Sequence, residues 1–62
     1  MNREERLRNL ILDRYTSLRQ FSLEADIPYS TLLTMLSRGI GGASFDAVMR
    51  ICGKLNIDPY EL

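Results

Sequence analysis

Apolar residues recur at intervals of three and four along most of the chain, which is the spacing of one face of an α-helix. This pattern predicts helices over residues 2–14, over 17–25, over 29–37 and over 44–56. No stretch alternates apolar and polar residues as a half-buried β-strand does. The chain is therefore predicted to be all-α, with a further helix beginning at Asp58.

Each predicted helix has one apolar face that would be buried against the other helices. The residues on these faces are Leu7, Leu10, Ile11, Tyr15, Leu18, Phe21, Ala25, Leu32, Leu36, Ala47, Val48, Ile51, Cys52 and Leu55. Cys52 is the only cysteine and the chain has no histidine, so it has neither a partner for a disulfide nor a base to activate a thiol. We therefore interpret Cys52 as a small buried apolar residue.

Residues 26–39 contain the clearest turn, helix and stop signals of the chain. Pro28 disfavours helical geometry in the residue before it, so any helix that arrives from the preceding residues must end there. Asp26 can hold the turn because aspartate tolerates the left-handed conformation. Gly39 supplies the positive φ that commonly ends a helix. A short helix held after a tight turn behind another short helix is a helix-turn-helix arrangement.

Side chains suited to helix N-termini mark three other starts. Ser17 and Gln20 have the spacing of a capping box. Ser44 is a favourable N-cap, and Asp58 followed by Pro59 has the same role before the last predicted helix. Between the third and fourth helices, three glycines in four positions form a loop. This loop is either a simple connection whose conformation requires positive φ, or a segment whose backbone amides lie close to a phosphate.

The length of 62 residues corresponds to one domain, over residues 1–62, either on its own or as the N-terminal part of a longer regulator. Eight basic and eight acidic residues give a net charge of zero, whereas nucleic-acid-binding domains are often basic. Most of the cations are arginine, so phosphate binding depends on where those arginines lie. The polar N-terminus is unlike a signal peptide, and no apolar run approaches a membrane span. These features favour a cytoplasmic protein with no membrane partner.

The order and spacing of these signals resemble the DNA-binding domain of the phage repressor and Cro family of helix-turn-helix regulators. The segments that carry the resemblance are SLRQFS (17–22), IPYSTL (27–32), RG (38–39), SFDAVMRIC (44–52) and LNIDPYEL (55–62). The resemblance implies a compact, lambda-repressor-like bundle of four or five helices. Its second and third helices would form the motif, and the third, at about 29–37, would lie in the major groove of DNA.

The resemblance also implies which residues would contact DNA. Those that would reach base edges are Tyr29, Ser30, Thr31, Leu33 and Thr34. Those that would contact phosphates are Ser17 and Arg19, at the start of the second helix, and Ser37 or Arg38, after the third. Four of these residues have an alternative role: Tyr29 packing over the turn, Thr31 capping the helix, Leu33 in the core, and Arg38 in solvent.

The sequence departs from the family at several positions, among them Ser22, where the family has alanine. Asp26 stands where the family often has glycine, which brings a carboxylate near the DNA-facing side. Leu18 stands where the family often has glutamine, which removes a phosphate contact. The base-contacting positions carry no arginine, lysine, asparagine or glutamine, the residues that pair most sharply with bases. We therefore expect modest specificity from one monomer.

Two functions of different classes fit this sequence. The first is a sequence-specific DNA-binding transcriptional regulator, of the prophage or mobile-element repressor type, with double-stranded DNA as partner. If it forms a homodimer, two half-sites would lie about 34 Å apart. The second is a protein-interaction module, such as an antitoxin or adaptor, which the zero net charge and the apolar Tyr29, Leu33 and Ile40 favour. An enzyme, a metal, a cofactor and a small-molecule substrate are not expected, because no catalytic or ligand cluster is present in the sequence.

Overall fold

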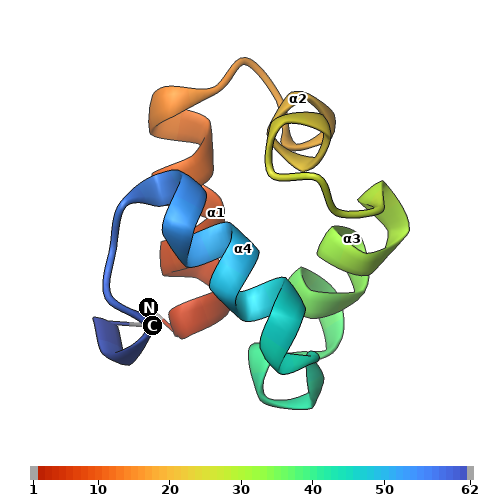
Figure 1. Ribbon diagram of the computed structural model, residues 1–62, viewed down its shortest axis with the longest axis vertical. Coiled ribbons are helices and arrows are strands. Elements are labelled where there is room, and N and C mark those ends of the chain that lie inside the picture. The colour runs from red at the N-terminus through yellow and green to blue at the C-terminus, as the bar shows by residue number, and fades with distance from the viewer. Residues whose placement is uncertain (1, 62) are drawn as a thin grey trace.

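The computed structural model describes residues 2–61 (Figure 1). Its elements in chain order are α1 (Arg3–Arg14), α2 (Leu18–Glu24), α3 (Tyr29–Arg38), the 3-10 turn η1 (Ile40–Gly42), α4 (Phe45–Leu55) and the 3-10 turn η2 (Pro59–Glu61). No strand occurs within the described residues, so the prediction of an all-α fold is confirmed. The helix predicted to begin at Asp58 is only the turn η2, and Leu62 lies outside the described residues.

The N-cap hydrogen bonds predicted for Ser17 and Ser44 are formed. The Ser17 hydroxyl accepts a hydrogen bond from the Gln20 backbone N–H at 3.1 Å, which satisfies one of the free amides at the start of α2. The reciprocal half of the capping box is not observed, because the Gln20 side chain instead donates to Glu24 at 2.9 Å. Asn2 and Ser44 cap α1 and α4 in the same way as Ser17 caps α2.

The four helices enclose one apolar core. Its buried members are Leu7, Ile11, Phe21, Ala25, Ile27, Leu32, Met35, Leu36, Ile40, Ala47, Ile51 and Leu55. Cys52 is buried, and Leu10, Tyr15, Leu18 and Val48 are half-buried against the core, so the predicted faces are confirmed. The prediction that Ile40 contributes to an exposed apolar surface is wrong. Its side chain is only 6% exposed and belongs to the apolar core, as the buried residue of η1.

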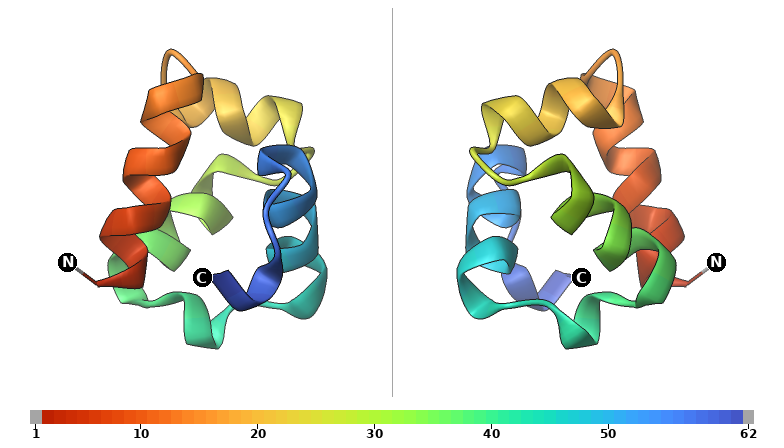
Figure 2. Two further views of the ribbon diagram at one scale, coloured as in Figure 1. Left: turned by 90° about the vertical axis from the view of Figure 1, so that its left-hand side faces the viewer. Right: turned by 90° about the vertical axis from the view of Figure 1, so that its right-hand side faces the viewer.

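Helix α3 packs against both α1 and α2. The views of Figure 2 place α2 across the upper end of the molecule and η1 at the lower end, with α3 descending between them. Helix α4 is joined to α1 at its C-terminal end, where the Arg14 guanidinium donates to the backbone carbonyl of Leu55. Because α1 and α2 both pack against α3, they fix its orientation and leave its remaining face exposed to solvent.

Candidate nucleic-acid interface

The turn between α2 and α3 is a helix C-terminal motif with aspartate at its left-handed position. Asp26 has φ of 59°, as predicted for this turn. The N–H of Ile27 bonds to the carbonyl of Ser22 at 3.1 Å, and the N–H of Asp26 bonds to that of Leu23 at 3.3 Å. These two bonds are those of a Schellman motif, which reverses the chain in a few residues. The direction in which α3 leaves α2 is therefore defined by backbone hydrogen bonds.

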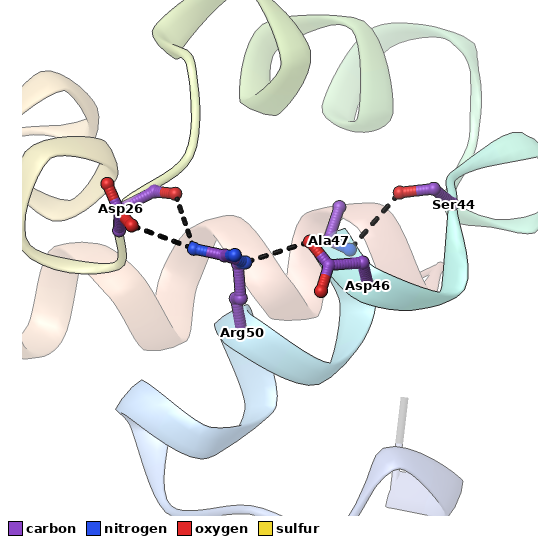
Figure 3. Close-up of polar contacts among 5 residues, drawn as sticks. All are labelled: Asp26, Ser44, Asp46, Ala47 and Arg50. Atoms are coloured by element: carbon purple, nitrogen blue, oxygen red, sulfur yellow. Dashed lines mark hydrogen bonds and ion pairs between the residues drawn. The ribbon is translucent and has the colours of Figure 1, made fainter.

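Arg50 of α4 holds this turn from outside (Figure 3). Its Nη1 donates to the backbone oxygen of Asp26 at 3.1 Å and to the Asp26 carboxylate at 2.8 Å, while its Nε donates to Asp46 at 2.8 Å. The hydrogen bond to Asp46 is the main reason that the pKa of the Arg50 guanidinium is raised, and the hydrogen bond to Asp26 is the second. The carboxylate expected near the DNA-facing side is thus paired with a cation rather than left alone.

The outer face of α3 carries most of the residues that the sequence placed at base edges. Leu32, Met35 and Leu36 of this helix are buried, so the opposite side faces water. The exposed residues of this side, here called the outer face, are Ser30, Leu33, Thr34, Ser37 and Arg38. Leu33 is 38% exposed and is not a core residue. Thr31 is half-buried, and α3 has no side-chain cap, so Thr31 does not cap the helix.

Tyr29 and Arg19 meet at the start of α3. The guanidinium carbon of Arg19, on α2, lies 4.5 Å from the centre of the Tyr29 ring, which is cation–π geometry. The Tyr29 ring is half-buried in this contact. The structure therefore brings together one residue predicted to contact bases and one predicted to contact phosphate. Ser17, the other predicted phosphate residue of this region, is exposed at the N-cap of α2.

Ser37 and Arg38 lie at the other end of α3. The Ser37 hydroxyl donates to the Thr34 carbonyl at 3.4 Å, within its own helix. Arg38 is exposed and forms no ion pair with any residue of 2–61. It borders a groove of about 470 Å³ that is lined by α3 residues and by the loop that follows, from Gly39 to Ser44. An exposed cation without a carboxylate partner is suited to an anionic ligand.

The glycine-containing loop is held from the side of α1. Gly39 has φ of 117°, which confirms that its position requires glycine. The backbone N–H of Ile40 donates to the Glu4 carboxylate at 2.9 Å, and this hydrogen bond is the main reason that the pKa of Glu4 is lowered. The Ile40 N–H already donates a hydrogen bond within the protein, so it is not free to bind a phosphate. Gly41 and Gly42 remain exposed.

Three interactions that hold this region were not found from the sequence. Arg50 and Glu4 each bond a residue more than twenty positions away, and sequence spacing does not reveal such pairs. The only local signal for Arg50 was its spacing of four from Asp46, which is a common helix ion pair. The stacking of Arg19 on Tyr29 likewise depends on the angle between two helices.

The family comparison agrees with this geometry. The family model of the Cro/C1-type HTH DNA-binding domain matches residues 6–62, which is most of the chain. The chain belongs to the Cro/C1-type helix-turn-helix family. In this Cro/C1-type domain, α2 and α3 are the two helices of the motif. Its family identifies it as a DNA-binding transcription regulator.

No curated protein and no solved structure gave a significant match to this Cro/C1-type domain. Among residues 2–61, no helix is long and apolar enough to cross a membrane. Within the same residues, no group of three acidic, cysteine or histidine side chains is placed to hold a metal ion.

Proposed function

We propose that this domain is a sequence-specific transcriptional repressor of the prophage or mobile-element type, which inserts α3 into the major groove of DNA. The observation that carries the proposal is the outer face of α3, which presents small polar and apolar side chains to solvent between Arg19 at one end and Arg38 at the other. The major groove of B-DNA is wide enough for an α-helix, and flanking cations can contact the phosphates on its two sides.

The outer face suggests how bases would be distinguished. The hydroxyls of Ser30 and Thr34 can donate to or accept from base edges, and Leu33 can contact the methyl group of thymine. Tyr29 and Thr31, both half-buried, would contact bases only at the margin of this face. None of these side chains makes a bidentate pair with a base, so we expect each half-site to contribute limited discrimination.

The flanking groups would fix the position of the helix on the duplex. Arg19 and Arg38 supply the charge, while the hydroxyls of Ser17 and Ser37 can bond to phosphate oxygens. We further propose that the domain works as a homodimer, because two half-sites compensate for limited discrimination by each. Because a repressor must reach DNA, we propose that this domain acts in the cytoplasm.

Selection of bound duplexes from a pool of random sequence tests this proposal. We expect a preferred sequence to be enriched, and the recovered duplex to shift the amide NMR signals of Ser30, Leu33 and Thr34. Signals of Leu12 and Asp13, on the exposed side of α1, serve as controls and should not move. Failure to enrich any sequence from a folded sample would overturn the proposal, as would shifts confined to α1.

The second candidate is a protein-interaction module. Zero net charge and the exposed Leu33 favour it, although the buried Ile40 does not contribute to such a surface. This candidate predicts that Leu33→Asp abolishes binding of a protein partner, while no duplex binds even at low salt. Salt-dependent binding to a random duplex would instead support phosphate contact and the repressor.

A further inference from the structure

A groove of about 570 Å³ lies between the α2–α3 turn and α4, and its lining comes from α2, the turn, the start of α3 and α4. The Arg50 side chain extends across it from α4 to Asp26 (Figure 3). Lys54 and Glu24 also join α4 to α2, but their charged atoms are 3.9 Å apart, compared with 2.8 Å for Arg50 and Asp26. Arg50 is therefore the closer polar link between α4 and the helix-turn-helix motif.

Arg50 contacts Asp26 at two atoms whose relative placement depends on the conformation of that residue. One nitrogen, Nη1, donates to the Asp26 carboxylate at 2.8 Å and to the Asp26 backbone oxygen at 3.1 Å. The direction of the backbone oxygen follows ψ and that of the carboxylate follows χ1, so one donor reaches both only in a narrow range of conformations. The bond from Nε to Asp46 at 2.8 Å, one turn earlier on α4, keeps the planar guanidinium in place.

The backbone of Asp26 is the point of the turn that most needs such support. Its φ is 59°, a conformation that is less favourable for a residue with a side chain than for glycine. Helix α3 begins three residues later, at Tyr29. Packing against α1 and α2 sets the general orientation of α3, and the conformation of Asp26 limits the remaining variation at its N-terminal end.

We propose that Arg50 is a positioning residue for DNA sequence selection, which keeps the outer face of α3 at one angle to the major groove by holding Asp26 in its left-handed conformation. This inference rests on the proposed function, because it concerns how the same outer face is held. Arg50 does not contact DNA in this role. Hydrogen bonds to bases need a narrow geometry, whereas attraction to phosphates tolerates displacement, so loss of the link lowers selectivity more than general affinity.

The exposure of the link limits the size of the effect. A link can favour one orientation of α3 only by as much as its own free energy. The Arg50 and Asp26 side chains are 43% and 91% exposed, and exposed ion pairs change an equilibrium by up to about fivefold. We therefore expect loss of the link to lower the ratio of dissociation constants for a scrambled and a selected duplex by about two- to fivefold.

Arg50→Lys tests the positioning role at constant net charge. Lysine keeps the positive charge but lacks the planar fork that bonds Asp46 and Asp26 together. The ratio should fall about two- to fivefold, while affinity for the scrambled duplex and its salt slope stay at the wild-type values. Arg8→Lys makes the same change at an exposed arginine of α1 and should have no effect. Each variant must keep the helical circular dichroism and melting temperature of the wild type.

Three results of these binding measurements would overturn the inference. They are an unchanged ratio for Arg50→Lys, an equal fall for Arg8→Lys, and equal weakening of Arg50→Lys on both duplexes, which would indicate a general charge effect. A double variant adds a check, because Asp26→Gly removes the carboxylate that Arg50 holds. In that background Arg50→Lys should lower the ratio much less, and a full further fall would contradict the link.

Amide hydrogen exchange tests the link without DNA. The Ile27 N–H closes the turn through its bond to the Ser22 carbonyl, so local opening of the turn exposes it to exchange. Arg50→Lys should speed exchange at Ile27 about two- to fivefold, whereas the Tyr15 N–H at the end of α1 should keep its wild-type rate. No change at Ile27 would rule out the link, and equal acceleration at both amides would show a global loss of stability instead. If the wild type distinguishes no duplex, the proposed function fails, but exchange at Ile27 still decides whether Arg50 holds the turn.

Discussion

Replacing Arg38 with alanine should weaken binding to every duplex and make binding less dependent on salt. On the proposed DNA-contacting side, Arg19 and Arg38 are the arginines without an ion pair among residues 2–61, whereas Arg50 is engaged by two carboxylates. We therefore assign about two phosphate charges to each monomer. Counterion release then gives a logarithmic salt slope of about −1.8 for one monomer, since each contact contributes about −0.9.

This slope sets the magnitude to be measured. Between about 50 and 200 mM salt, a slope of −1.8 lowers affinity about 12-fold, and loss of one contact reduces this to about 3.5-fold. For a dimer the corresponding factors are about 150-fold for the wild type and about 12-fold for Arg38→Ala. These losses are small for a DNA-binding domain because the chain has no excess of positive charge.

Fluorescence anisotropy with a labelled duplex at several salt concentrations measures the slope directly. Arg8→Ala is the matched control, because it removes the same charge from the exposed side of α1. We expect Arg8→Ala to keep the wild-type slope. An unchanged slope for Arg38→Ala would refute the assignment, and so would equal flattening by both variants.

Two further predictions concern the turn and the loop. Asp26→Ala should be less stable than Asp26→Gly by about 1 kcal/mol in denaturant unfolding, since both lose the carboxylate but only alanine is strained at positive φ; equal stabilities would show that the left-handed turn is not retained. The lowered pKa of Glu4 means that its bond to Ile40 stabilises the fold above the ordinary carboxyl range and is lost as pH falls through the folded pKa. Melting temperature should therefore fall less steeply on acidification below pH 4.5 in Glu4→Gln than in the wild type, and identical profiles would contradict this.

Local sequence signals predicted the parts of the fold that depend on neighbouring residues. Ser17 and Ser44 cap helices because a hydroxyl three residues before a free amide can reach it in any helix of this kind. Asp26 and Gly39 take the positive φ that their residue types permit. Heptad-like spacing likewise identified the buried faces, because the period of a helix does not depend on its partners.

Contacts between distant segments were not predicted. Ile40 is buried and its amide bonds to Glu4, 36 residues earlier, only because the start of α1 lies against η1. Arg50 reaches Asp26 because α4 passes beside the turn. The exposure of Phe45 was not predicted either, since an aromatic residue at the start of a helix is commonly buried.

The candidate site was predicted to a similar extent. The sequence identified the exposed residues of α3, but not that Tyr29 is held by Arg19 or that Thr31 is half-buried. Both depend on the crossing of α2 and α3, which is set by the turn and by packing of the whole core. Periodicity alone left open whether Leu33 lies in the core or faces solvent. Its exposure shows that it faces solvent.

The central claim is that the outer face of α3 distinguishes DNA sequences. Its most direct test is the ratio of dissociation constants for a selected duplex and a scrambled duplex of the same length at one salt concentration. We predict a wild-type ratio of about 10³, at the low end for specific DNA-binding proteins. Thr34→Ala should lower this ratio while leaving affinity for the scrambled duplex unchanged. Equal affinity of the wild type for both duplexes would contradict the claim.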